Sequence, residues 1–286
     1  MDPRILALYD EYTHAPLDRR VFLTRLAVLA GGALAAQMLL PLLEPSTAHA
    51  ALVEPSDARL VIERLTFLGA TGDVACYTAR PKGEVRHAVV IVIHENRGLN
   101  AHIEDVARRL ALEGFWAVAP DLLSPIGGTP ADPDSARAGI GKLDRLATVG
   151  NAVAAVGFLA KHQQSNGKVG AVGFCWGGAM VGELAVQAAD LDAGVVYYGR
   201  QPAAEAVESI KAPLLLHYAG TDERVNAGIP AFEEALKKAK KKYTLHTYEG
   251  AQHAFNNDTS EARYDKKSAD LAWSRTVDFL RKHLKA

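Results

Sequence analysis

The sequence predicts an α/β fold, in which helices cover both faces of a mostly parallel sheet. From residue 52 onward, short β-branched runs alternate with amphipathic stretches of helical length, which is the pattern of repeated βαβ units. Residues 88–93 are Ala-Val-Val-Ile-Val-Ile, a continuous apolar run typical of a strand that is buried on both faces. We therefore expect one catalytic domain over residues 51–286, preceded by a separate segment over residues 1–50.

The first two strands flank Thr71-Gly72 and are expected to form an antiparallel pair at the start of the sheet. The expected strands span residues 61–69, 73–79, 88–93, 115–119, 169–173, 193–198, 213–218 and 243–248. The expected helices span residues 103–112, 143–162, 178–188, 230–239 and 268–283. Residues 124–134 are rich in glycine and proline and are predicted to be a loop that borders a pocket.

Composition excludes several classes of partner. The chain of 286 residues has 49% hydrophobic and 23% charged residues, which fits one ordinary globular domain with residues left for a tail. Its 32 basic and 33 acidic residues nearly cancel, so no electrostatic footprint for nucleic acid is present. The expected partner is a small molecule. Of the two cysteines, Cys76 lies in a predicted strand and is expected to be a packing residue.

The N-terminus has the features of an export signal. Residues 18–24, Asp-Arg-Arg-Val-Phe-Leu-Thr, resemble a bacterial twin-arginine signal, and residues 26–43 form an apolar run. Ala48-His49-Ala50 follows with the small residues of a cleavage site. We expect residues 1–50 to engage the twin-arginine export machinery and to be cleaved, with the mature enzyme in the periplasm or outside the cell.

The alternative for the same segment is a retained membrane anchor. The apolar run approaches the roughly 20 residues that span a bilayer. In that case the protein would touch the membrane through this segment alone.

The sharpest local pattern is residues 173–178, Gly-Phe-Cys-Trp-Gly-Gly, between a predicted strand and a predicted helix. This is the G-x-S-x-G nucleophile elbow of α/β-hydrolases with Cys175 in place of serine. The helix N-terminus that follows favours a thiolate over a thiol. Cys175 is therefore the predicted nucleophile.

An acid and a histidine follow the nucleophile in the chain order that the α/β-hydrolase fold requires. Asp222 comes after the strand at 213–218, and His253 comes after the strand at 243–248. An imidazole is suited to act as the base, and a carboxylate would fix its tautomer. Asp258 and Asp121 are rival acids, of which Asp258 lies only five positions beyond His253.

Four motifs together resemble the dienelactone hydrolase family: residues 94–100, residues 173–178, Val196-Tyr197-Tyr198-Gly199 and Gln252-His253-Ala254-Phe255. The resemblance runs from about residue 60 to the C-terminus. It implies that Cys175, Asp222 and His253 are the catalytic residues. It also implies that Glu95 contacts the resting cysteine until substrate displaces it, and that the backbone N–H groups of Asn96 and Trp176 form the oxyanion hole. An ion pair of Glu95 with Arg97 is the alternative role for that carboxylate. Candidate pocket residues are His94, Arg97, Arg137, Tyr198 and Phe255.

The sequence departs from the family after the catalytic histidine. Members that act on dienelactone have an arginine there that holds the substrate carboxylate, whereas this chain has Asn256-Asn257-Asp258. Arg137 is the nearest candidate for a second family arginine. Because an acid at position 258 would repel a carboxylate, we expect a neutral or cationic substrate.

The predicted function is hydrolysis of a small ester or lactone through a thioester acyl-enzyme, with no cofactor and no metal ion. A cysteine hydrolase directed at thioesters or peptides, and a binding module that has lost turnover, are the alternatives.

Overall fold

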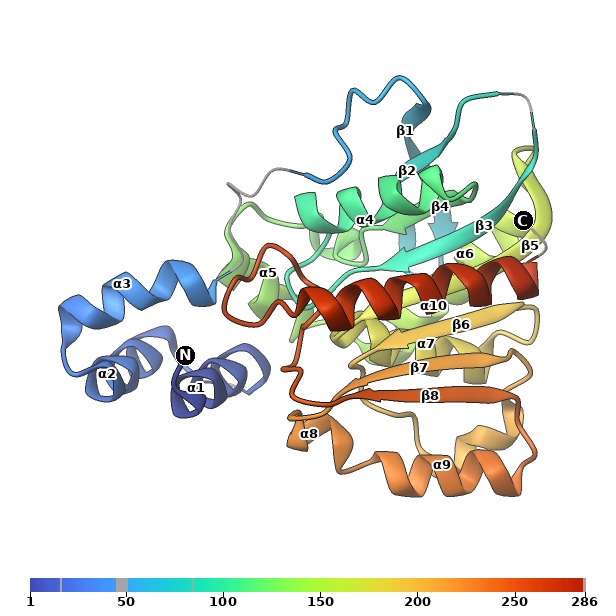
Figure 1. The fold of residues 1–286 in the computed structure, drawn as a ribbon. Helices are drawn as coiled ribbons and strands as arrows, with labels where there is room; N and C mark the ends of the chain where they lie inside the picture. The colour runs from blue at the N-terminus through green and yellow to red at the C-terminus, as the bar shows by residue number, and fades with distance from the viewer. Residues whose placement is uncertain (16, 45–50, 84, 285–286) are drawn as a thin grey trace.

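A computed structural model describes residues 1–15, 17–44, 51–83 and 85–284. Its centre is an eight-stranded sheet with the spatial order β1-β2-β4-β3-β5-β6-β7-β8 (Figure 1). The strands are β1 (Leu60–Gly69), β2 (Gly72–Pro81), β3 (His87–Ile93), β4 (Trp116–Pro120), β5 (Ser165–Phe174), β6 (Ala193–Tyr197), β7 (Leu214–Ala219) and β8 (Tyr243–Tyr248).

The sheet is antiparallel at one edge and parallel over the rest. β1 pairs with β2, and β2 with β4, in antiparallel register, while each pair from β4 to β8 is parallel. The predicted α/β-hydrolase fold and the antiparallel strand pair at the start of the sheet are confirmed. The carboxyl ends of the parallel strands meet at one edge, where ligands bind in open α/β sheets.

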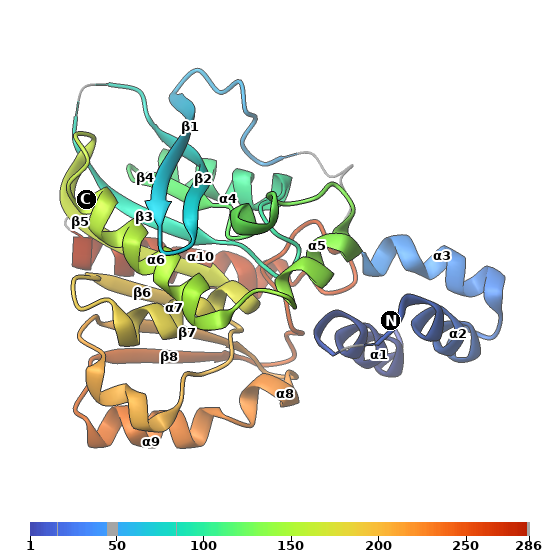
Figure 2. The ribbon, with the colours of Figure 1, turned by 180° about the vertical axis from the view of Figure 1, so that it is seen from behind.

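Helices cover both faces of the sheet. Apolar residues of α4 (Ala101–Leu112) and α10 (Lys266–Leu284) form the core on one face, and those of α6 (Arg145–Ala160), α7 (Trp176–Gln187) and α9 (Ile229–Lys238) form the core on the other (Figures 1 and 2). The strands between these two layers are almost entirely buried, as their continuous apolar runs require.

The predicted loop at residues 124–134 is partly helical. It contains the short 3-10 turn Ser124–Ile126 and leads into α5 (Pro133–Ile140). The side chain of Asp132 accepts a hydrogen bond from the backbone N–H of Ser135 and so caps α5, and Pro133 occupies the first helical turn. Two further short elements are the 3-10 helix Ala204–Ser209 and α8 (Glu223–Asn226).

The described residues 1–15 and 17–44 form three helices, α1 (Pro3–His14), α2 (Arg19–Ala30) and α3 (Ala33–Leu43). They share a hydrophobic core of their own, in which the rings of Tyr12 and Phe22 stack at 4.2 Å. Figure 1 shows these helices beside α5, at the carboxyl ends of the parallel strands. The three helices therefore lie at the edge of the sheet where substrate is expected to bind.

The apolar run at residues 26–43 is not one helix. It is interrupted at Gly31 and Gly32, and α2 and α3 meet there at 111°. No single helix among the described residues is long and apolar enough to cross a membrane, although α2 with α3, and α5 with α6, reach that length as bent pairs. The expected cleavage site Ala48-His49-Ala50 lies outside the described residues.

Candidate active site

Cys175 lies on the sharp turn between β5 and α7, in the strained backbone conformation that the elbow pattern predicts. Its φ is +56° and its ψ is −117°, which is unfavourable for a residue with a side chain. The turn places Cys175 at the N-terminus of α7, where the helix dipole favours a negative charge on sulfur. The side chain is 6% exposed and lines a cavity.

Close approach of two backbone segments explains the glycines around Cys175. A Cβ atom on Gly173 would lie 2.1 Å from the carbonyl oxygen of Gly177, and one on Gly177 would lie 2.3 Å from that of Ile93. The end of β3 thus touches the first turn of α7. This contact brings the residues that follow β3, including Glu95 and Asn96, to the elbow.

His253 and Asp222 come together beside the elbow. Asp222 follows β7 and caps α8, and its Oδ2 accepts a hydrogen bond of 2.5 Å from His253 Nδ1. Both side chains are buried. Burial opposes the charge on His253, but the thiolate of Cys175 and the carboxylate of Asp222 raise its pKa to about 10. Burial opposes the charge on Asp222, but the hydrogen bond to His253 and the nearby positive charges of His253 and Arg224 together lower the pKa of Asp222.

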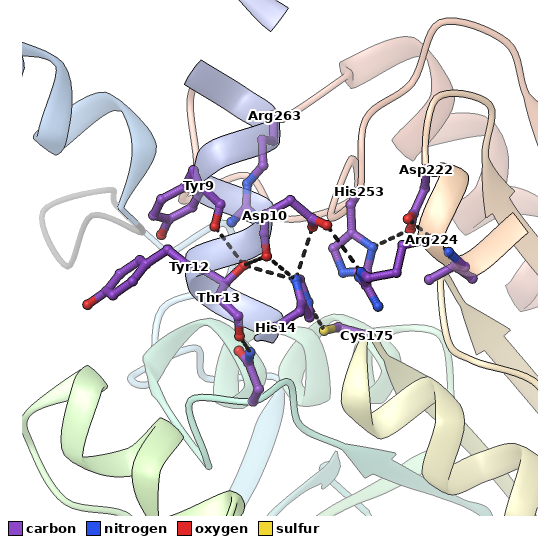
Figure 3. Close-up of polar contacts among 12 residues, drawn as sticks. Tyr9, Asp10, Tyr12, Thr13, His14, Cys175, Asp222, Arg224, His253 and Arg263 are labelled. Atoms are coloured by element: carbon purple, nitrogen blue, oxygen red, sulfur yellow. Dashed lines mark hydrogen bonds and ion pairs between the residues drawn. The ribbon is translucent and has the colours of Figure 1, made fainter. Parts of the chain in front are cut away.

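The sulfur has two imidazole neighbours. His14, at the end of α1, places its Nε2 3.1 Å from Cys175 Sγ. The sulfur and one ring nitrogen from each of His14 and His253 all lie within 4.8 Å of one another (Figure 3). Burial raises the pKa of the thiol, but His14 and then His253 oppose burial and bring the pKa of Cys175 down to about 6. A thiolate is therefore the main form at neutral pH.

Glu95 is buried close to this cluster, with different partners from those expected. Its carboxylate accepts hydrogen bonds from Asn257 Nδ2 at 2.7 Å and from the hydroxyl of Tyr198 at 3.4 Å. Arg97, its alternative partner, donates instead to the hydroxyl of Tyr9. The hydrogen bond to sulfur that the family resemblance assigns to Glu95 is made by His14.

The two residues expected at the oxyanion hole lie on either side of the contact between β3 and α7. Trp176 is the first residue of α7, so its N–H has no acceptor within the helix. Asn96 donates through its side-chain amide to the carbonyl oxygen of Thr13.

His94 is fully buried, stacks on Trp176 and bonds to backbone atoms of Glu95 and Leu122, so it is a packing residue at the strand end.

A cavity of about 740 Å³ opens beside Cys175. Tyr198, Trp176 and His14 contribute to its wall, as the sequence predicts for Tyr198. Phe255 is fully buried among aromatic rings behind the site and does not line this cavity.

Cys76 is buried in β2, where burial raises its pKa to about 12, consistent with a packing role.

Three arginines line the same cavity: Arg137, Arg200 and Arg224. Arg137 donates a hydrogen bond to the carbonyl oxygen of Tyr12, and Arg224 Nε lies 3.1 Å from Asp10 Oδ2. Arg200 is exposed at the rim. The cavity is therefore cationic, and sequence reasoning identified only Arg137 among these residues.

The expectation of a neutral or cationic substrate rested on Asp258, and that argument was wrong. Asp258 is paired with Arg109 at 2.5 Å and with His102 at 3.1 Å, and it does not line the cavity of Cys175. Its charge is compensated locally, and these partners lower its pKa to about 2 despite burial. Asp121 binds its own loop through Thr129 and Leu123.

Sequence reasoning missed His14 because residues 1–50 were set apart as a signal. Asp10 and His14 are four positions apart, so both lie on one side of a helix. A helical reading of residues 3–14 would have paired them. Nothing in the sequence, however, indicates that this pair reaches Cys175, which lies 161 positions further along.

Comparison with known proteins agrees with the family that the four sequence motifs indicate. Residues 74–284 match the family model described as the dienelactone hydrolase family, and residues 1–31 match a second one described as YqhI-like. A protein of Saccharolobus solfataricus named as a carboxymethylenebutenolidase is 35% identical over 231 residues, covering 68% of this chain and 88% of its own length. A protein of Escherichia coli with the same name is 30% identical over 246 residues, which cover 80% of this chain and 89% of that protein.

Solved structures of dienelactone hydrolase-like proteins have a similar fold. A crystal structure described as a dienelactone hydrolase of Klebsiella pneumoniae has a TM-score of 0.71 at 25% identity, and it covers 78% of this chain and 99% of its own. A dienelactone hydrolase-like promiscuous phosphotriesterase from metagenomic libraries has a TM-score of 0.69 at 25% identity. The match covers 79% of this chain and 99% of that protein.

Proposed function

Because this chain belongs to the dienelactone hydrolase family, whose members hydrolyse lactone and ester bonds, we propose that it opens a small ester or lactone with the thiolate of Cys175. The observation that carries the proposal is the position of Cys175 on the elbow beside the bonded pair of His253 and Asp222. His253 acts as the base and Asp222 fixes its tautomer.

In the proposed reaction the thiolate attacks the carbonyl carbon, and the carbonyl oxygen becomes an oxyanion. The backbone N–H groups of Asn96 and Trp176 stabilise that oxyanion; removal of one such donor typically costs about 10²–10³ in rate. The C–O bond then breaks and leaves a thioester on Cys175. Water that loses a proton to His253 attacks the thioester, and the thiolate leaves.

We also propose that the substrate carries a carboxylate. Arg137, Arg200 and Arg224 line the cavity, and arginine binds a carboxylate through two parallel hydrogen bonds. A Bradyrhizobium relative, 31% identical over 226 residues, is named as a lactonase of a propanoate, which is a carboxylate substrate. The buried carboxylate of Glu95 lines the same small space as Cys175, which supports control of the nucleophile as its proposed role.

Export remains part of the proposal. Arg19 and Arg20 with the apolar residues that follow support recognition by a twin-arginine machinery. Fractionation of cells, with mass spectrometry of the N-terminus, distinguishes a cleaved periplasmic form from a retained, anchored one.

The decisive experiment is a screen of small esters, lactones and thioesters against the full chain, with mass spectrometry of the trapped acyl-enzyme. We expect an adduct on Cys175 and none in Cys175→Ala. Cys76→Ala is the matched control, because Cys76 is the other cysteine and is buried in β2. Full turnover by Cys175→Ala would refute the proposed nucleophile.

A further inference from the structure

The helix α1 is held against the catalytic domain by contacts from several elements. Asn96 Nδ2 donates to the carbonyl oxygen of Thr13 at 2.6 Å, and Arg97 donates to the hydroxyl of Tyr9 at 2.9 Å. Both residues follow β3. From α5, Asp134 accepts a hydrogen bond of 2.6 Å from the hydroxyl of Tyr12.

Charged and aromatic groups extend the same interface. The guanidinium of Arg137 lies 4.3 Å from the centre of the Tyr12 ring, and that of Arg263 lies 4.9 Å from the centre of the Tyr9 ring. Arg19 forms an ion pair of 2.6 Å with Asp134. These contacts fix α1 along its length, so the position of His14 at its end is determined by many interactions.

Asp10 and His14 resemble the pair of Asp222 and His253 on the opposite side of the sulfur. His14 Nδ1 bonds to the backbone carbonyl oxygen of Asp10 at 2.9 Å and lies 3.0 Å from Asp10 Oδ1 as an ion pair, while its Nε2 lies 3.1 Å from Cys175 Sγ. The rings of His14 and His253 meet edge to face at 4.5 Å. Cys175 is therefore flanked by two imidazoles, and each imidazole has a carboxylate on its far nitrogen (Figure 3).

His14 forms part of the cavity wall and does not seal the cavity. The space of about 740 Å³ is lined by Cys175 and by His14 together. Its rim includes the exposed residues Asp18, Gly141 and Arg200, so it opens to solvent with α1 in place. A small substrate has room beside both the sulfur and the imidazole.

We propose that His14 is a second catalytic residue of this hydrolase, with Asp10 as its positioning residue. This inference rests on the proposed function of Cys175, and it applies to the form of the protein that retains residues 1–50, because cleavage after Ala50 would remove Asp10 and His14. The protonated ring of His14 holds the sulfur as a thiolate through Nε2–H. When the C–S bond forms, sulfur loses its negative charge, and the same Nε2–H is free to protonate the leaving oxygen as the C–O bond breaks.

The protons then balance over one turnover. His14 is neutral after acylation. Because acylation also removes the thiolate charge that raises the pKa of His253, His253 releases its proton to solvent and then takes one from the attacking water. The product acid returns its proton to His14, and the thiolate that re-forms keeps His253 protonated, so the net reaction is ester plus water to carboxylate, alcohol and a proton. His14 thus acts in bond cleavage and His253 in hydrolysis of the thioester.

The charges that face His14 favour its protonated form. Asp10 lies on its own helix, and the thiolate of Cys175 faces it from the elbow. Burial and His253 oppose a charge, yet the thiolate and Asp10 raise the pKa of His14. Arg224 pairs with Asp10, and Glu95, Arg97 and Arg263 line the small space behind the ring.

The test compares His14→Asn with the parent in the full chain on two esters that share an acyl group. A nitrophenyl ester needs no acid for its leaving group, whereas an ethyl ester does. We expect kcat/KM to fall about 10²–10⁴-fold on the ethyl ester and much less on the nitrophenyl ester. His162→Asn is the matched control, because His162 lies at the end of α6 and outside the cavity.

Further measurements distinguish a catalytic role of His14 from a purely structural one. The pH at which iodoacetamide alkylates Cys175 at half its maximal rate should rise in His14→Asn and in Asp10→Asn. Imidazole should restore part of the activity of His14→Gly. Hydrogen exchange of residues 3–14 reports whether α1 stays docked in each variant; if it does not, His14→Gln, whose side chain is longer, replaces the asparagine.

Two results would overturn the inference. Higher turnover of His14→Asn on both esters would mean that His14 obstructs the sulfur, and equal loss on both esters would mean that it has no role as an acid. Cys175→Ala, tested in parallel, separates the two proposals. If that variant is inactive while His14→Asn is unimpaired, only the role of His14 is wrong; if it is fully active, the nucleophile is wrong as well.

Discussion

His253 Nδ1 donates a hydrogen bond of 2.5 Å to Asp222 Oδ2, and this pair joins the loop after β8 to the loop after β7. Both side chains are buried, so the bond fixes which nitrogen of His253 faces the sulfur. The relationship shows how the proposed acid and base, 31 positions apart, form one hydrogen-bonded unit.

Replacing Asp222 by Asn should leave the fold intact and remove the negative charge behind His253. The asparagine holds the ring less well and does not stabilise the imidazolium, so we expect kcat to fall by about 10³–10⁴. Steady-state kinetics on an activated ester measures the loss. Asp258→Asn is the comparison variant, because Asp258 pairs with Arg109 outside the site; a similar loss in both variants would contradict the assignment of Asp222.

The pH dependence should follow the thiol. Because the pKa of Cys175 is lowered to about 6, the thiolate is lost as pH falls through that value and is fully present above it. We expect the rate of alkylation of Cys175 by iodoacetamide to rise between about pH 5 and 7 and then to level off. A midpoint near the ordinary thiol pKa of about 8.5 would show that the imidazoles do not stabilise the thiolate.

The elbow should tolerate no added methyl group at Gly177. The new Cβ would lie 2.3 Å from the carbonyl oxygen of Ile93, so β3 and α7 would have to separate. We expect Gly177→Ala to lower the free energy of unfolding by about 1–3 kcal/mol and to abolish acylation. Gly157→Ala in α6 is the control, since its Cβ would meet nothing within 4 Å and should be stabilising. Thermal unfolding of both variants checks this; equal melting temperatures would be evidence against the close contact.

A carboxylate on the substrate should be recognised at the cavity rim. Arg200 is exposed there, so Arg200→Ala should raise KM about tenfold for a lactone that carries a carboxylate. The methyl ester of the same lactone lacks the charge, and its KM should hardly change. If both substrates lose equally, Arg200 contributes to packing and does not recognise the carboxylate.

The sequence alone determined the sheet, the elbow and the strand that each proposed catalytic residue follows: Cys175 follows β5, Asp222 follows β7 and His253 follows β8. Alternation of apolar runs and amphipathic stretches is a local signal, and so is a glycine pattern that only one kind of turn satisfies. For the same reason the five expected helices, which are α4, α6, α7, α9 and α10, agree with the structure to within about two residues at each end, whereas α1, α2, α3, α5 and α8 were not predicted.

Only the tertiary structure decided which charges meet in the cavity. Asp258 was expected to repel a carboxylate, but Arg109 and His102 neutralise it elsewhere. His14 and Arg200 were not considered, yet both line the cavity of Cys175. Electrostatic partners depend on distances between residues far apart in the chain, and these distances exist only once the strands are ordered and α1 has docked against their ends.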